Sequence, residues 1–263
     1  MSIEINFSGL LVYLLVFARI AGMILLNPLF ARNNIPQMAR MGLVIGLTLL
    51  IAPMQPMDAV LAMGDLEYAF SLLRELFVGA IYGYVFIIFY YLLFYAGDIM
   101  DTDIGLAMAK SFDPATQIQV SFSGQLVTMF FVMYLFASGT HLALIRMYAD
   151  SFSYIPLGAS TLSLSISAFI MELFVSVFML AIRLVAPLMV AEFILQASMG
   201  ILMKFIPQIT VFVINFQLRI LLGVLLLFLL APYIGQFIDN YLTVMMDNLL
   251  GTTEVMSGGM DTT

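Results

Sequence analysis

The chain has 263 residues, of which 63% are hydrophobic and only 10% are charged, and its formal net charge is −7. Soluble domains contain about 25% charged residues, so this composition predicts a membrane protein. With nine basic residues and no basic stripe, the chain lacks a nucleic-acid-binding surface, and the lack of cysteine excludes disulfides and thiol chemistry.

Six apolar stretches approach or exceed the roughly 20 residues that a helix needs to cross the hydrocarbon core. They cover residues 9–30, 41–53, 69–97, 125–146, 168–202 and 209–238. Because a chain in lipid must satisfy its own backbone hydrogen bonds, all six are predicted to be helices, which makes the fold class all-α. The third, fifth and sixth are longer than one straight crossing requires, so tilt or kinks are expected, with a kink at Pro187.

The connections indicate an orientation and a tail. Arg32, Arg40, Lys110 and Lys204 lie in loops on one side, which the positive-inside rule assigns to the cytoplasm. A short turn after Lys204 joins the last two long helices, so these are predicted to form an antiparallel hairpin. The segment 241–263 is acidic and rich in Gly and Thr, so it is predicted to be a flexible tail.

Ionisable side chains interrupt several predicted spans. Each costs about 2.5–3.5 kcal/mol at the bilayer centre, so they are expected to face protein or water instead of lipid. Residues four apart share one helix face, and small residues on such a face let helices approach closely. This reasoning selects eleven residues for helix or subunit packing: Arg19, Gly42, Gly46, Glu75, Gly79, Gly83, Glu192, Gln196, Gly200, Arg219 and Gly223.

Two interpretations of these residues remain open. They could join helices within one bundle, or they could line contacts with other subunits or a water-filled path.

The sequence shows no arrangement that predicts catalysis. His141 is the only histidine and has no cysteine or helical carboxylate pair to complete a metal site. Asp98, Asp101 and Asp103 lack the terminal glutamate of a calcium loop. There is no serine elbow, phosphate loop or dinucleotide motif. The chain is therefore predicted not to be an enzyme and to hold no metal or cofactor.

The order of short motifs along the chain is more specific than any one of them. They are Arg19 with Pro28, Ile35-Pro36 with Arg40, residues 74–79 with Gly83, Ala96-Gly97 through Asp101 to Gly105-Leu106, Asp113-Pro114, Gly139 with His141, Ser151-Phe152 with Pro156, Ala186-Pro187, residues 205–208, and Val211-Phe212 with Leu218 and Gly223. In this order the chain resembles the FliR family, the export-gate subunits of the flagellar type III secretion system, and its injectisome counterparts.

The resemblance implies a fold and a function. Residues 1–165 would form a FliP-like helical part and residues 166–240 a FliQ-like helical hairpin. The chain would be a non-enzymatic part of the pore that exports unfolded flagellar proteins across the inner membrane, within the flagellar basal body. Its partners would be FliP-like and FliQ-like subunits, membrane lipid, the exported cargo, and an FlhB-like regulator at the cytoplasmic turn of Lys204, Pro207 and Gln208.

The resemblance also implies that the connection over residues 105–124 plugs the pore. Its glycines could act as hinges, Pro114 breaks a helix, and its apolar side chains could seal. The residues assigned to this plug are Gly105, Met108, Phe112, Asp113, Pro114, Phe122 and Gly124.

One alternative function is a secondary transporter or ion channel that uses Glu75 and the Asp98–Asp103 carboxylates. Such proteins are often built from inverted repeats with matched broken helices. The two halves of this chain differ in span length and loop character, which disfavours that interpretation.

Overall fold

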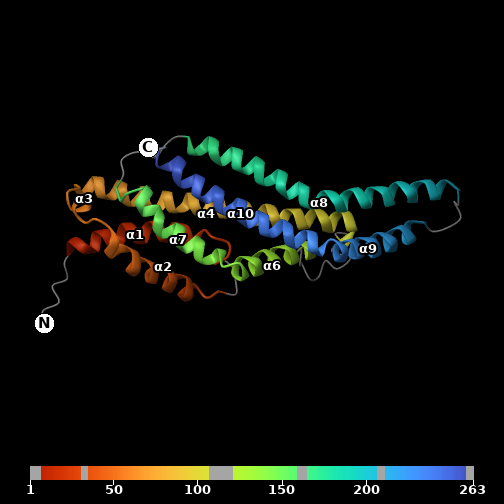
Figure 1. The fold of residues 1–263 in the computed structure, drawn as a ribbon, viewed down its shortest axis with the longest axis horizontal. Coiled ribbons are helices and arrows are strands. Elements are labelled where there is room, and N and C mark those ends of the chain that lie inside the picture. Colours follow the sequence, from red (N-terminus) through yellow and green to blue (C-terminus); the bar gives the residue numbers. More distant parts are fainter. Residues whose placement is uncertain (1–6, 31–34, 107–120, 159–164, 206–210, 259–263) are drawn as a thin grey trace. The chain divides into compact units, whose positions relative to one another are not determined.

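The computed structural model describes residues 7–30, 35–106, 121–158, 165–205 and 211–258, and every regular element in these ranges is helical. Figure 1 shows these elements along the chain and labels the α-helices. They are α1 (Phe7–Leu25), α2 (Gln37–Ile51), the 3-10 helix η1 (Ala52–Met54), α3 (Asp58–Leu61), α4 (Asp65–Ile104), α6 (Phe122–Ala137), α7 (Thr140–Tyr154), α8 (Ile166–Phe205), α9 (Val211–Leu229) and α10 (Ala231–Met256). The all-α prediction is confirmed.

Several of these helices have the length and composition of membrane spans. Within the described ranges, three qualify outright, namely Gln37–Met54, α4 and α8, and up to five qualify if the bent pairs α6 with α7 and α9 with α10 each count as one. The helix α1 is apolar over Gly9–Leu25 but shorter than a full span. The chain is therefore a polytopic helical membrane protein, as its composition predicts.

The fourth and sixth predicted spans are each broken into two helices. Gly139 separates α6 from α7 with φ 76°, a left-handed conformation that favours glycine. The second break lies between Leu229 and Ala231, where the chain bends by 57°. Pro232 stands in the first turn of α10, where a missing backbone N–H costs nothing. The helix α8 has the same assignment on both sides of Pro187, and the kink expected there stays a prediction.

The chain forms two compact units. One comprises residues 1–88, 139–173 and 244–263, and the other comprises residues 89–138 and 174–243. The long helices α4, α8 and α10 each contribute to both units. These units do not follow the division at residue 165 that the family resemblance implies, and that division stays a prediction.

The flexible tail predicted from residue 241 is wrong over most of its length, because α10 continues to Met256. Tyr241, Met245 and Leu249 follow one another at four-residue spacing and are buried. In the first unit, the hydroxyl groups of Tyr82 and Thr253 lie 2.7 Å apart. The acidic and Gly/Thr-rich composition hid an amphipathic helix whose apolar face packs on the protein.

Candidate functional site: buried charges between the helices

In the first compact unit, α1 and α4 touch through their backbones at glycine. A methyl group added to Gly79 would overlap the carbonyl oxygen of Arg19, and one added to Gly22 would lie 2.7 Å from the carbonyl oxygen of Leu76. One turn further along α4, a methyl group on Gly83 would lie 2.8 Å from Cβ of Leu26. Glycine is needed here because any side chain would push the two helices apart.

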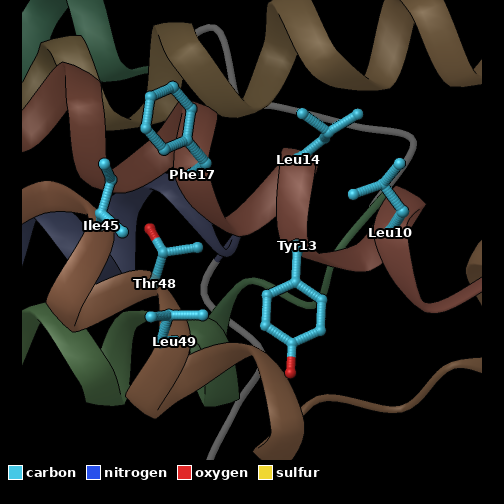
Figure 2. Close-up of a pocket in the computed structure, with 7 residues that line it drawn as sticks. All are labelled: Leu10, Tyr13, Leu14, Phe17, Ile45, Thr48 and Leu49. Carbon is cyan, nitrogen blue, oxygen red and sulfur yellow. The ribbon is translucent and has the colours of Figure 1, made fainter. Parts of the chain in front are cut away.

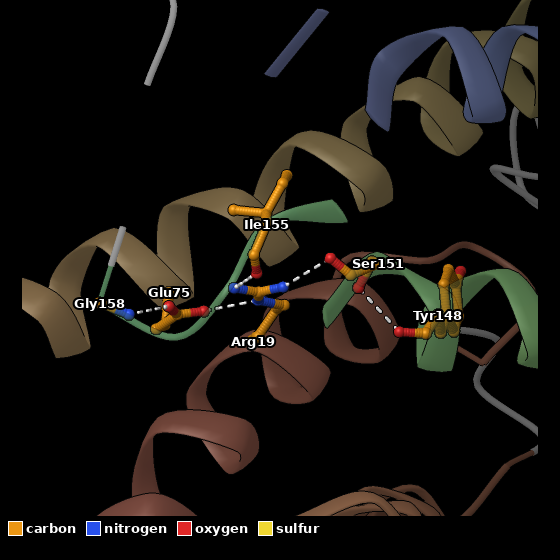
Figure 3. Close-up of polar contacts among 6 residues, drawn as sticks. All are labelled: Arg19, Glu75, Tyr148, Ser151, Ile155 and Gly158. Atoms are coloured by element: carbon orange, nitrogen blue, oxygen red, sulfur yellow. Dashed lines mark hydrogen bonds and ion pairs between the residues drawn. The ribbon is translucent and has the colours of Figure 1, made fainter. Parts of the chain in front are cut away.

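The close approach brings Arg19 of α1 against Glu75 of α4. Both side chains are buried, and Nε of Arg19 donates a hydrogen bond to Oε2 of Glu75 over 2.5 Å. Figure 3 shows the guanidinium group between this carboxylate and the end of α7. A buried ion pair of this kind avoids the large cost of an isolated charge.

The rest of the guanidinium is used by the C-terminal end of α7. Nη1 donates to the carbonyl oxygen of Ser151 over 3.1 Å, and Nη2 donates to that of Ile155 over 2.9 Å. The carbonyl of Ser151 also accepts the backbone N–H of Ile155. Because the C-terminal end of a helix carries the negative end of its dipole, a cation stabilises it. The ring of Phe152 adds a cation–π contact, with its centroid 4.2 Å from Cζ of Arg19.

The remaining carboxylate oxygen of Glu75 is also satisfied. Oε1 accepts a hydrogen bond from the backbone N–H of Gly158 over 3.3 Å. Close by, the side chain of Asn27 donates to the hydroxyl of Tyr148 over 3.3 Å. This cluster ties α1, α4 and α7 together, and its charged groups are fully engaged in holding the helices.

In the second unit, Asp101 near the end of α4 holds the first turn of α6. One carboxylate oxygen accepts the backbone N–H of Phe122 over 2.6 Å and the hydroxyl of Ser121 over 2.9 Å, while the other accepts the N–H of Ser123 over 3.0 Å. The hydroxyl of Ser121 accepts the N–H of Gly124 as a helix cap. Asp101 is fully buried, so the free N–H groups of a helix start supply the positive end that its charge requires.

The same region positions both ends of the predicted plug. Gly97 lies so close to Gly124 that a methyl group on it would overlap the backbone of α6. Gly105 has φ 87°, which favours glycine. Phe122 is exposed. Four plug residues, Met108, Phe112, Asp113 and Pro114, lie outside the described residues, as do Pro207 and Gln208 of the predicted cytoplasmic turn.

The second unit also brings together Glu192 of α8 and Arg219 of α9, with 3.6 Å between Oε2 and Nε. Gly223 of α9 lies against Ile104 at the end of α4, where an added methyl group would meet the Ile104 side chain at 2.5 Å. Lys204 is exposed in the last turn of α8.

Other predicted packing residues are not brought into close contacts. A methyl group added to Gly42, Gly46 or Gly200 would meet nothing within 4 Å in the described part of the chain, and Gln196 is exposed. Their four-residue spacing matches that of Gly79 and Gly83, yet spacing alone does not say whether a second helix lies opposite.

An apolar groove lies between α1 and α2 and was not found by sequence reasoning (Figure 2). Its volume is about 250 Å³, and it is lined by Leu10, Tyr13, Leu14, Phe17, Ile45, Thr48 and Leu49. The hydroxyl of Thr48 is not free to bind a ligand as a donor, since it already donates a hydrogen bond to the carbonyl oxygen of Val44 over 2.7 Å. The groove therefore offers apolar contact area and no free polar group from Thr48.

The fold and these clusters define a class, a polytopic helical membrane protein whose buried charges join its helices. The profile of the bacterial export proteins, family 1, matches residues 10–245. The chain belongs to this family, and its resemblance to FliR is confirmed.

Curated relatives agree with this family over nearly the whole chain. The flagellar biosynthetic protein FliR of Escherichia coli (strain K12) is 24% identical over 233 residues, which cover 89% of each chain. That of Bacillus subtilis (strain 168) is 26% identical over 240 residues, or 90% of this chain and 92% of the relative. The Yop proteins translocation protein T of Yersinia pestis is 24% identical over 241 residues, with the same coverage.

Proposed function

We propose that this chain is a structural, non-enzymatic subunit of the flagellar type III protein export gate, and that it forms part of the pore for unfolded flagellar proteins in the inner membrane. The observation that carries the proposal is the family match over residues 10–245, together with relatives named as flagellar biosynthetic proteins. A further relative is named for the translocation of Yop proteins, which supports protein transport as the function.

The alternative of a transporter or ion channel loses support at two of the carboxylates it would use, Glu75 and Asp101. Glu75 is engaged by Arg19 and Gly158, and Asp101 is engaged by the first turn of α6. A carboxylate that binds a transported ion must exchange its partners easily, whereas these two are buried and hydrogen-bonded on both oxygens.

The proposed assembly contains FliP-like and FliQ-like subunits. Residues 1–165 would be the FliP-like part and residues 166–240 the FliQ-like hairpin. This is supported by the large apolar side chains that α8 and α9 expose, among them Phe193 at 72%, Leu221 at 68% and Phe228 at 78%. Apolar surface of this extent needs lipid or a partner helix to cover it.

In this assembly, residues 105–124 are the plug, and the turn of Lys204, Pro207 and Gln208 meets an FlhB-like regulator at the cytoplasmic entrance. The plug assignment is supported by the fixed geometry of its two ends, where Asp101 clamps the start of α6 to the end of α4.

The test of the function uses cells that lack this chain and cells that carry a tagged copy. Without the chain, export of flagellar proteins should stop, and the tagged copy should restore it and co-purify with FliP-like and FliQ-like proteins. A photo-crosslinker at Lys204 should capture the FlhB-like protein. Normal export without the chain, or a tagged copy that restores export but purifies free of these partners, contradicts the proposal.

The plug is tested by deleting residues 113–119 and measuring leakage. A protein-sized channel without its plug should pass small ions and solutes, so membrane permeability should rise in cells that contain the assembled gate. Co-purification with the partner subunits checks assembly in the same cells. If the gate that lacks residues 113–119 assembles and the membrane permeability equals that of cells with the intact gate, these residues do not close the pore.

A further inference from the structure

Glu192 is a buried carboxylate with unused hydrogen-bonding capacity. It lies on α8 in the second unit and is only 1% exposed. Its nearest cation is Arg219, but 3.6 Å between Oε2 and Nε is too long for a good hydrogen bond. Neither carboxylate oxygen of Glu192, nor Nε of Arg219, has a hydrogen-bond partner among the described residues.

A second acid comes from the end of α4. Asp103 lies within electrostatic range of both Glu192 and Arg219, and its buried Oδ2 has no hydrogen-bond donor in the described ranges. The end of α4 lies close to α9 here. A methyl group on Gly105, the residue after α4, would lie 3.7 Å from Cδ in the side chain of Arg219. Asn215, one turn before Arg219 on α9, adds another buried acceptor without a donor in the described chain.

The charges of this cluster do not balance. Asp103 and Glu192 carry two negative charges when ionised, and Arg219 supplies one positive charge. No other ionisable group among the described residues makes up the difference. Asp101 is held by α6, Asp98 has interactions of its own, and the remaining bases of α8, Arg183 and Lys204, are exposed. A buried charge without a partner is costly in a membrane protein, so a further positive charge is needed.

A proton meets both needs of the cluster. It cancels the excess charge, and a protonated carboxyl group becomes a hydrogen-bond donor among acceptors that have none. A metal cation would supply charge but no donor, and it would be repelled by the guanidinium of Arg219.

We propose that Asp103, Glu192 and Arg219 form a proton-binding site, in which one carboxyl group carries a proton and the other pairs with Arg219. The step is a simple transfer of one proton from water to a carboxylate oxygen, with release by the reverse path. The proton decides whether Arg219 pairs with Asp103 of α4 or with Glu192 of α8, and so it sets how firmly the end of α4 is held. This inference does not depend on the proposed role in export.

The test is infrared spectroscopy of the full-length protein, purified in lipid with whatever subunits co-purify and titrated with acid and base. The C=O stretch of a protonated carboxylic acid is separate from the carboxylate bands. At neutral pH the wild-type protein should show this band, with a shift in D₂O that marks an exchangeable proton. Glu192→Gln or Asp103→Asn should abolish it. The matched control is Glu172→Gln, which changes an exposed acid of the same helix α8 and should leave the band in place.

Isotope labelling gives the assignment without any substitution, in case a variant fails to fold. Wild-type protein labelled with ¹³C at the carboxyl groups of either glutamate or aspartate should shift the band in one of the two samples. The proposal is overturned if the wild type shows no carboxylic-acid band at neutral pH, if the band survives in both folded variants, or if it disappears in Glu172→Gln.

Discussion

At the scale of single residues, the buried charges of the first unit are engaged on every side. Arg19 uses three nitrogens on Glu75, Ser151 and Ile155, and Glu75 uses both oxygens. A buried ion pair adds little stability compared with a well-packed apolar pair, but loss of one partner leaves the other charged and unsatisfied. The energetic role of such a pair is therefore visible only when one member is removed.

We predict that Arg19→Met lowers the stability of the purified complex by about 3–5 kcal/mol, because Glu75 keeps its buried charge without a counter-ion. The double variant Arg19→Met with Glu75→Met should lose less stability than the single variant Arg19→Met. Thermal unfolding in detergent measures both, with Arg183→Met, at an exposed arginine of α8, as the control. Equal or additive losses in the double variant would show that the two side chains act independently.

At the scale of helices, glycine decides how closely two elements approach. Gly79 of α4 lies directly on the backbone of α1 at Arg19, and this proximity brings Glu75, one turn away, within reach of the guanidinium. The clash that a side chain would create involves backbone atoms, which cannot rotate away as a side chain can.

We predict that Gly79→Ala destabilises the complex by about 1–3 kcal/mol or more, as overpacking of a tight contact does. Gly42→Ala is the matched control in α2, where the added methyl group meets open space and alanine favours the helix. The yield of folded complex and its unfolding temperature report both effects. If Gly79→Ala left both the yield and the unfolding temperature unchanged, the close α1–α4 contact would be contradicted.

At the scale of the whole molecule, three helices, α4, α8 and α10, each contribute to both compact units. The last turns of α10 belong to the first unit and bury Leu249, Thr253 and Met256. Thr253 meets the hydroxyl of Tyr82 on α4, 171 residues earlier in the chain. The C-terminal region is therefore part of the folded core of the first unit.

We predict that deletion of residues 244–263 prevents accumulation of the folded chain, because the apolar surface of the first unit that α10 covers would be exposed. Deletion of residues 259–263 alone leaves every described contact of α10 in place and should be tolerated. Membrane fractions probed for the chain and for its partners separate the two outcomes. Normal accumulation and assembly of the longer deletion would contradict a role for the end of α10 in the core of the first unit.

Part of this structure follows from local features of the chain. The apolar stretches had to be helices, since lipid leaves no other way to satisfy the backbone, and within the described residues the larger part of each stretch is helical. The four-residue spacing of Glu75, Gly79 and Gly83 places them on one helix face wherever that helix packs. The breaks in two spans and the helical end of α10 were harder to predict. Apolar composition alone does not mark a turn at Gly139, and the Gly, Thr and acidic residues of 241–256 masked the apolar face between them.

The sequence by itself determined the class of protein, the positions of its apolar helical stretches and its family, because these depend on composition, periodicity and the order of motifs. Only the tertiary structure decided which polar groups meet. Arg19 and Glu75 are 56 residues apart. The other acceptors of Arg19 are the backbone carbonyl groups of Ser151 and Ile155, and every residue has such a group, so nothing in the sequence marks these two. Gly42 and Gly79 stand in the same kind of pattern, but within the described part of the chain another helix lies against Gly79 and none against Gly42. Such partners are fixed by packing in three dimensions, where a contact depends on distance and burial and leaves no local mark on the residues that make it.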